Sequence, residues 1–214
     1  MEKDNLHNLR QIIAQHAARM MAEEGISDFA YAKKKASKQM HIHNHTMLPS
    51  NVEIEAELKL YNALFLSDAQ PIHLAILRQD ALTTMQLLEK FNPHLTGAVL
   101  DGTAGFGTET HIHVFADSLK EIEMFLLNQQ IPFETNEKSY RMLNDGKRDK
   151  KGADRKKVPV FSLETESSQI KISVFDVDDI RTSAKHAVDG RNAQRANIEV
   201  VKQLLTKNTN NPLI

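Results

Sequence analysis

The hydrophobic pattern of this 214-residue chain changes near Asn92 and Pro93, and this change most constrains the fold. Before that point, apolar residues recur every three or four positions, as they do on one face of an α-helix. After it, apolar and polar residues alternate, as they do in half-buried β-strands. We therefore expect an α+β protein, with a helical domain over residues 1–91 and, over residues 92–214, a domain built on a mixed β-sheet flanked by helices.

Four helices are expected in residues 1–91, each marked by apolar residues at helical spacing. Gly25 is placed to end the first helix, and Ser27 or Asp28 to cap the second. Ser50 and Glu53 have the spacing of a capping box at the start of the third. A fourth helix, with a proline in its first turn, is expected to run to about residue 91.

Six strands and two helices are expected in the second domain. The expected strands cover residues 96–100, 110–115, 132–135, 140–143, 158–163 and 169–175. The expected helices cover residues 118–129 and 196–205. Residues 144–157 are polar and basic, which predicts a long loop or a disordered segment.

Composition excludes several classes of function. The chain has no cysteine, so disulfides, thiolate catalysis and cysteine–zinc sites are ruled out. Its net charge is −1, so no overall field attracts nucleic acid, although basic runs occur at Lys33–Lys38 and at 147–157. Such runs form either solvated surface or contacts with phosphate. The start of the chain does not resemble a signal peptide, and no run approaches the roughly 20 apolar residues of a membrane span. We expect a cytoplasmic protein without membrane contacts, and the oligomeric state stays open.

A glycine-rich loop separates the first two expected strands. It contains Gly102, Thr103, Gly105 and Gly107, and it lacks the Gly-Lys-Ser/Thr ending of a P-loop. Glycine lets backbone amides approach an anion closely, so one interpretation is a phosphate-binding loop. The other is a hairpin loop between two strands.

Glu109, His111 and His113 follow this loop at alternate positions of an expected strand. Alternate side chains of a strand project from the same face, so the three should lie together, in a concavity shared with the glycine-rich loop. Carboxylate and neutral imidazole are both ligands for transition metals. The alternative is a polar strand face without a ligand.

The segment Arg181–Arg195 follows the last strand and carries several basic residues, including Lys185 and Arg191. Arginine can hold a phosphate through two parallel hydrogen bonds, so this segment is a candidate clamp for an anion. The alternative is a structural connection to the last helix, with a tight turn at Asp189-Gly190.

Together these segments resemble the core of the DNA polymerase β-like nucleotidyltransferases. In that superfamily a Gly-Ser-like pair precedes an Asp-x-Asp or Asp-x-Glu motif, and a later strand adds a third carboxylate. Here Gly97-Ala98 stands for the first pair, and Glu109-Thr110-His111 or His111-Ile112-His113 for the paired carboxylates. The later strand offers Lys171 or Ser173.

The whole chain is also similar to a family of bacterial proteins labelled nucleotidyltransferase-like. The similar stretches are Ala17–Ile26, Ala32–Ala36, Leu48–Asn51, Gly97–Ala104, His113–Asp117 and Val188–Arg191.

The resemblance implies nucleotide chemistry at a degenerate site. Transfer in this superfamily uses two magnesium ions, which prefer oxygen ligands in an octahedron. At most Glu109 supplies such a ligand here. We therefore expect a protein that binds a nucleotide or a nucleic-acid phosphate without transferring it. The expected phosphate-binding residues are Gly97, Gly102, Thr103, Gly105, Gly107, Lys185 and Arg191.

Two alternatives remain. One is an active enzyme whose catalytic residues, Glu109, His111 and His113, hold manganese or zinc in place of magnesium. The other is an interaction module that meets RNA or a protein through the Lys33–Lys38 helix.

Overall fold

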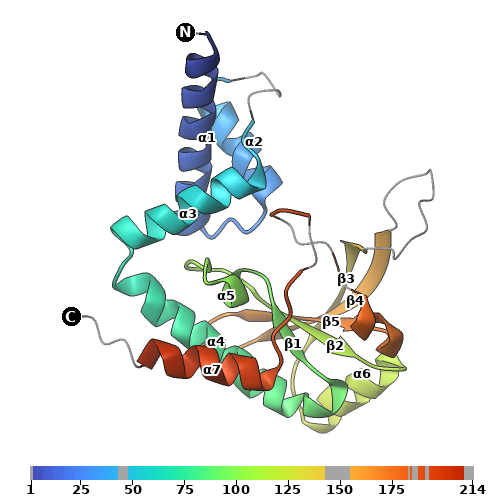
Figure 1. Cartoon of the computed structure of the whole chain (residues 1–214). Coiled ribbons are helices and arrows are strands. Elements are labelled where there is room, and N and C mark those ends of the chain that lie inside the picture. Colours follow the sequence, from blue (N-terminus) through green and yellow to red (C-terminus); the bar gives the residue numbers. More distant parts are fainter. Residues whose placement is uncertain are drawn as a thin grey trace. The chain divides into compact units, whose positions relative to one another are not determined.

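The computed structural model describes residues 2–42, 48–142, 155–182, 184, 188–190 and 193–209 (Figure 1). The chain forms two compact units. The helical unit consists of Met1–Leu74, Gly102–Thr108 and Ala187–Asp189, and the sheet unit of Ala75–Asp101, Glu109–His186 and Gly190–Ile214. The sheet unit thus begins before residue 92. The glycine-rich loop, which was expected in the second domain, belongs to the helical unit.

Three helices form the helical unit. They are α1 (Glu2–Glu24), α2 (Phe29–Gln39) and α3 (Asn51–Phe65). The side chain of Asp28 accepts a hydrogen bond from the Tyr31 amide at the start of α2, which confirms one of the two expected caps. The core of this unit is Ile13, Ala14, Ala17, Ala18, Met20, Met21, Ala22, Ala32, Ala36, Ile54 and Leu58.

The expected capping box at the start of α3 is confirmed, and it is reinforced from α1. Glu53 Oε2 accepts hydrogen bonds from the Ser50 amide at 2.6 Å and from Arg10 Nη2 at 2.8 Å. Burial alone would raise the pKa of Glu53, but the hydrogen bonds from Arg10 and Ser50 lower it to about 2. The Glu53 carboxylate therefore joins the start of α3 to α1 in its ionised form.

This carboxylate makes the stability of the helical unit depend on pH. Because the folded pKa is about 2 and the ordinary value is 4.5, the stabilisation is complete above pH 4.5 and is lost as the pH falls towards 2. The Glu53 side chain is 39% exposed, so solvent screening limits the effect to about 1 kcal/mol.

We expect Glu53→Gln to lower the free energy of unfolding by about 1 kcal/mol at neutral pH and to match the parent near pH 2. Urea unfolding across this pH range measures the difference. Glu57→Gln is the matched control, since Glu57 lies on the same helix and contacts only Gln11, at 3.4 Å, among its hydrogen-bond partners in the described chain. A Glu53→Gln deficit that is constant with pH would contradict the assignment.

The sheet unit contains a five-stranded mixed sheet, as expected for an α+β fold. Its strands are β1 (His94–Thr96), β2 (Thr110–Phe115), β3 (Glu134–Arg141), β4 (Arg155–Glu164) and β5 (Gln169–Phe175). They are ordered β1-β2-β5-β4-β3, and only β2 and β5 are parallel neighbours. The parallel pair puts β5, a late segment, directly beside β2 at the centre of the sheet.

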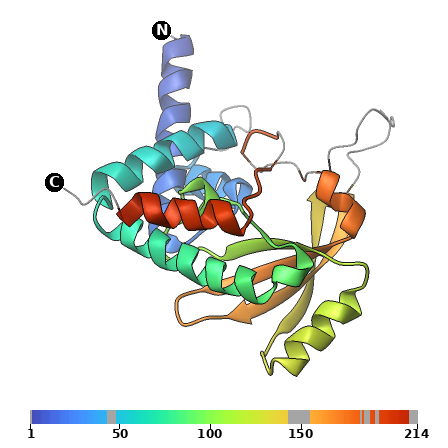
Figure 2. The ribbon, with the colours of Figure 1, turned by 60° about the horizontal axis from the view of Figure 1, so that its bottom comes forward.

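Helices surround this sheet. They are α4 (Ala69–Leu87), α5 (Ala98–Asp101), α6 (Leu119–Asn128) and α7 (Ile198–Thr209), with short 3-10 helices at Glu89–Phe91 (η2) and Val177–Arg181 (η3). In both ribbon views α7 lies alongside α4 (Figures 1 and 2). None of the helices in the described part of the chain is long and apolar enough to span a membrane.

The expected strand over residues 96–100 is wrong. The strand ends at Thr96, because Gly97 adopts a positive φ of 74°, and residues 98–101 form the short helix α5. Buried Arg78 donates hydrogen bonds to the carbonyls of Val99 at 3.0 Å and Leu100 at 3.1 Å. These bonds satisfy carbonyl groups that so short a helix cannot pair internally.

Three other expected boundaries also differ. The two short strands at 132–135 and 140–143 are one edge strand, β3, whose exposed polar residues hide the alternation and suit a sheet edge. Residues 155–157 of the expected loop belong to β4, and residues 143–154 lie outside the described chain. The last helix starts at Ile198, because Ala196 is bridged to Leu95 beside β1.

The two faces of the sheet differ in chemistry. On one face, side chains such as Ile112, Val114, Phe161, Ile170 and Ile172 are buried and apolar. The opposite face carries the alternate residues of the same strands, many of which are polar. We call it the polar sheet face.

Candidate functional site

The register of β2 and β5 brings the expected site residues together with new ones. His111 lies opposite Lys171, and His113 lies opposite Ser173. The polar residues of the polar sheet face include Glu109, His111, His113, Glu134, Lys138, Tyr140, Ser162, Glu164, Lys171 and Ser173. The side chains of His111 and His113 therefore share one face, as the alternation predicted, and Glu109, which precedes β2, reaches His111 and Lys171 of this face.

Glu109 lies between a histidine and a lysine. Its carboxylate is 3.7 Å from Lys171 Nζ and 4.0 Å from His111 Nε2. The same lysine donates a hydrogen bond to Ser162 Oγ at 2.9 Å. Lys171 thus offsets the charge of Glu109, the carboxylate that follows the glycine-rich loop.

Both histidines of this face are neutral at physiological pH. Burial lowers the pKa of His111 to about 3, and the positive charges of Lys138 and Lys171 contribute. Burial also holds the pKa of His113 well below its usual range, with a contribution from Arg195. A neutral imidazole can donate one hydrogen bond and accept another, so these rings can contact a ligand without adding charge.

Two ring nitrogens of this site are buried without a partner. Neither His111 Nδ1 nor His113 Nδ1 has a hydrogen-bond partner among the described residues. Buried polar atoms are normally paired with protein, water or a ligand. These two nitrogens are thus unsatisfied buried groups of the polar sheet face among the described residues.

Arg195 lies at the other end of the polar sheet face. Its guanidinium carbon is 5.1 Å from the centre of the Phe115 ring and 5.7 Å from that of Phe175. Nη1 makes long hydrogen bonds to the carbonyls of Asp179 and Ile180, at 3.4 and 3.3 Å. Nε and Nη2 are buried and have no partner among the described residues. Two nitrogens of the guanidinium thus lack an acceptor among the described residues.

Lys138 and Tyr140 add a third cation and a hydroxyl from β3. The ammonium of Lys138 is 5.4 Å from the centre of the Tyr140 ring, and Tyr140 Oη is 2.7 Å from Ser173 Oγ. Burial lowers the pKa of Lys138, Glu109 opposes this, and Lys171 adds to it. Lys138 is an exposed residue of the edge strand β3.

This face is chemically suited to an anion. It combines the cations Lys138, Lys171 and Arg195 with two neutral imidazoles and the Glu109 carboxylate, while Glu134 and Glu164 lie on the same face of β3 and β4. The described residues contain no group of three His, Asp, Glu or Cys placed to hold a metal ion. A metal on Glu109, His111 and His113 therefore stays a prediction.

The structure divides the expected phosphate-binding residues between the two units. Gly97 belongs to the sheet unit, and a Cβ added to it would lie 3.8 Å from His111 Cδ2. Gly102, Thr103, Gly105 and Gly107 belong to the helical unit, where Thr103 and Gly105 are buried and Gly107 is exposed. Lys185 and Arg191 lie outside the described residues. The concavity expected between the glycine-rich loop and the histidines remains a prediction.

Several polar groups of the glycine-rich loop already have partners. The amide of Gly105 donates to Thr108 Oγ1 at 3.0 Å. Gln70 Nε2 donates to the carbonyls of Gly102 at 3.1 Å and Ala104 at 2.9 Å. A Cβ on Gly105 would lie 3.1 Å from the carbonyl oxygen of Ala22 in α1. This loop is therefore packed closely against the end of α1, which accounts for its small residues.

The sequence analysis did not assign Lys138, Tyr140 or Arg195 to the site. Lys138 and Tyr140 occupy alternate positions of β3, so the sequence could indicate that they share a face. It could not indicate which strand β3 pairs with, and that pairing brings them to the site. Arg195 lies in the basic segment singled out above, so its residue type and position after the last strand did point towards anion binding.

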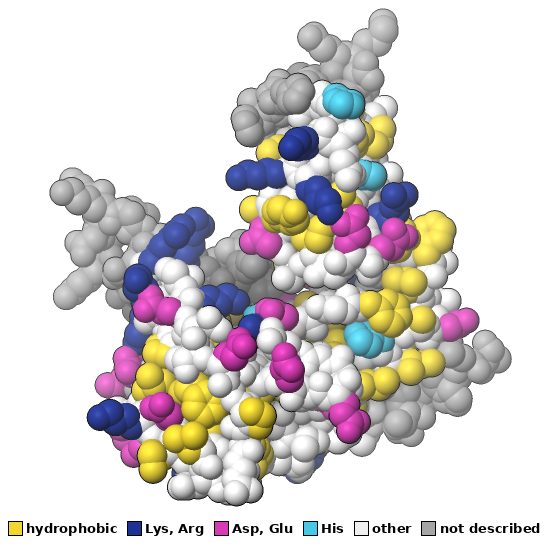
Figure 3. Space-filling view, turned by 180° about the vertical axis from the view of Figure 1, so that it is seen from behind, with side chains coloured by type: hydrophobic (Ala, Val, Ile, Leu, Met, Phe, Trp, Pro, Cys, Tyr) yellow, Lys and Arg dark blue, Asp and Glu magenta, His cyan; other side chains and the backbone are white. Residues whose placement is uncertain are grey.

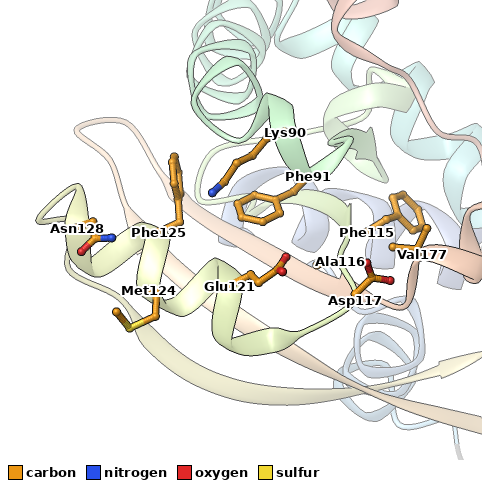
Figure 4. A pocket seen from close by; sticks show the side chains of 10 residues that line it. All are labelled: Lys90, Phe91, Phe115, Ala116, Asp117, Glu121, Met124, Phe125, Asn128 and Val177. Atoms are coloured by element: carbon orange, nitrogen blue, oxygen red, sulfur yellow. The ribbon is translucent and has the colours of Figure 1, made fainter.

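A separate hollow of about 480 Å³ lies between η2, α6 and the end of β2 (Figure 4). Lys90 Nζ lies over the rings of Phe91 and Phe125, at 4.5 and 4.4 Å, and Glu121 points its carboxylate into the hollow. Asp117 supplies a second carboxylate. Two carboxylates against one ammonium make this hollow a poor site for a phosphate.

The lysines of α2 are partly engaged within the helical unit. Lys33 donates to the Pro49 carbonyl at 2.8 Å, and Lys35 is 2.5 Å from Glu24. On the face of this unit shown in Figure 3, basic side chains (dark blue) occur with acidic (magenta) and apolar (yellow) ones. These contacts do not support the hypothesis of an interaction module based on Lys33–Lys38.

Comparison of the chain with protein-family models, with curated proteins and with solved structures finds no match in any of the three.

Proposed function

We propose that the protein binds a nucleotide or a nucleic-acid phosphate on the polar sheet face, and that it does not transfer the nucleotide. The observation that carries this proposal is a set of cations on one face: Lys138 and Lys171 lie near the Glu109 carboxylate, and Arg195 lies over the rings of Phe115 and Phe175. Burial is the main cause of the lowered pKa values of both histidines, and the nearby cations lower them further.

Each group has a distinct part in this proposal. Lys171 is engaged with Glu109 and Ser162, so Lys138 and Arg195 are the cations left to contact the ligand. The unpaired Nε and Nη2 of Arg195 provide a fork for two phosphate oxygens. His111 and His113 can add neutral hydrogen bonds.

The resemblance to polymerase β-like nucleotidyltransferases supports a nucleotide as the ligand. In that superfamily the residues here at β2 and the neighbouring strand would be carboxylates that hold two magnesium ions. By this resemblance, His111 or His113 would stand for one of the paired carboxylates and Lys171 or Ser173 for the third, and the register sets His111 opposite Lys171 and His113 opposite Ser173. An imidazole and an ammonium cannot provide the oxygen ligands that magnesium needs, so binding without transfer is expected.

Calorimetric titration with ATP in the presence of EDTA tests the proposal. We expect the parent to bind, and Lys138→Ala and Arg195→Ala each to weaken binding about tenfold or more, since hydrogen bonds to charged groups contribute about 1.5–3 kcal/mol. Lys157→Ala is the matched control, because Lys157 is a β4 lysine paired with Glu137 at 2.9 Å. Equal affinity in all three variants would place the ligand elsewhere.

The same preparation tests for transfer, with labelled nucleotide and magnesium. We expect no transfer above background, because Glu109 alone cannot hold both ions. Robust magnesium-dependent transfer that is lost in Glu109→Gln would overturn the proposal and establish an active enzyme.

A further inference from the structure

We propose that the hollow between η2, α6 and the end of β2 binds a free α-amino acid with an apolar side chain (Figure 4). Its volume of about 480 Å³ falls within the span of about 300–1,000 Å³ that is common for small-molecule sites. Lys138, Arg195 and the histidines of the polar sheet face do not line it. This ligand is therefore different from the proposed nucleotide, and its binding does not depend on the proposed function.

Aromatic rings form much of the lining of the hollow. Phe91 and Phe115 are almost completely buried, at 4% and 5% exposure, and the Phe125 ring meets that of Phe91 edge-on at 5.6 Å. Met124 and Val177 line the same hollow and are 55% and 44% exposed, so part of their apolar surface is open to a ligand. An apolar side chain placed here would remove this surface, together with its own, from water, which favours binding.

Charged groups of both signs also line the hollow. Lys90 is on η2, Asp117 follows β2, and Glu121 is in the first turn of α6. No other charged residue of the described chain lines it. The ammonium of Lys90 lies over two rings and makes no ion pair with either carboxylate within the described residues.

The carboxylate of Glu121 is not used to cap its helix. At the start of α6 the side chain of Ser118, and not that of Glu121, accepts the hydrogen bond from the Lys120 amide. Figure 4 shows the Glu121 carboxylate directed into the hollow. Its oxygens are therefore left for a ligand.

An α-amino acid matches this lining because it carries a positive and a negative group close together. Its carboxylate can accept a hydrogen bond from the Lys90 ammonium, and its own ammonium has three N–H donors for the carboxylates of Glu121 and Asp117. A phosphate would face two carboxylates, and a simple amine would leave Lys90 without an opposite charge. A zwitterion with an apolar side chain gives each part of the lining a suitable partner.

Three compounds of similar shape test this ligand class. They are L-phenylalanine, 2-phenylethylamine, which lacks the carboxylate, and 3-phenylpropionate, which lacks the ammonium. Titrated into the full chain by calorimetry at neutral pH, phenylalanine should bind at least about fivefold more tightly than either of the others, which is the upper end of what one ion pair contributes at an exposed site.

Two substitutions should each remove one half of this preference. In Lys90→Met, phenylalanine should bind no more tightly than phenylethylamine, and in Glu121→Gln its advantage over phenylpropionate should shrink. Glu123→Gln is the matched control, because Glu123 lies on the same helix and does not line the hollow. Phenylethylamine should bind Lys90→Met, and phenylpropionate should bind Glu121→Gln, at least as tightly as each binds the parent, which shows that the hollow is intact.

Equal affinities of the three compounds for the parent, or no binding of phenylalanine, would overturn the proposal. So would a preference for phenylalanine that survives in both variants, because the ligand would then bind elsewhere. None of these outcomes alters the result expected for ATP on the polar sheet face.

Discussion

A Phe175→Leu variant is expected to lose both ligand affinity and about 1–3 kcal/mol of stability, whereas Phe161→Leu should lose stability alone. The two phenylalanines form a matched pair. Both are almost completely buried, at 0% and 1% exposure, and both lie on central strands of the sheet. They differ in which face of the sheet they occupy.

Phe175 supports the polar sheet face. Its ring lies 4.6 Å from that of His113 and 5.2 Å from that of Tyr140, and Arg195 lies over it at 5.7 Å. A leucine leaves part of this volume empty and removes the flat surface on which the guanidinium rests. Phe161 instead meets Phe133 edge-on at 5.1 Å on the opposite face.

Urea unfolding and ATP titration of both variants measure the two effects. Because each leucine variant is expected to remain folded, a difference in affinity reports the site itself. An equal loss of affinity in Phe161→Leu would show that any loss of packing in the sheet weakens ligand binding. Phe175 would then have no special part in positioning Arg195.

The second large effect is expected at Gly25, where α1 ends. Gly25 has a φ of 68°, and a Cβ added to it would lie 2.9 Å from the carbonyl oxygen of Phe106. Gly25→Ala therefore combines left-handed backbone strain of about 1–2 kcal/mol with a clash against main chain that costs about 1–3 kcal/mol more.

Gly190→Ala separates the cost of backbone strain from the cost of the clash. Gly190 has a φ of 70°, and no atom of the described residues lies within 4 Å of an added Cβ, so backbone strain is the expected effect. Thermal unfolding should show Gly25→Ala as the more destabilised variant. If the two variants are destabilised equally, the packing of the glycine-rich loop against α1 does not contribute to stability.

Local signals in the sequence predicted much of the fold, because they depend on neighbouring residues. The capping box at Ser50 and Glu53 and the strand at Thr110–Phe115 were both predicted from spacing alone. The errors arose where the environment overrides the local pattern. The apolar run after Gly97 is helical because Arg78, distant in sequence, satisfies its carbonyls.

The candidate site was only half predictable for the same reason. Alternation along one strand placed Glu109, His111 and His113 on one face. The cations that determine its charge come from β3, β5 and the segment before α7, and the order of strands in a sheet is not encoded in the pattern of any one strand. Arg195, for example, gives no indication in the sequence that it lies over Phe115.

The packing of the glycine-rich loop constrains how the chain can fold as it leaves the ribosome. The helices α1 to α3 are complete by Phe65, yet the unit they form also includes Gly102–Thr108, with Gly105 against Ala22. Synthesis proceeds from the N-terminus at about 5–20 residues per second. The surface at the end of α1 that packs against Gly105 therefore stays uncovered for several seconds, until residues 102–108 have been synthesised.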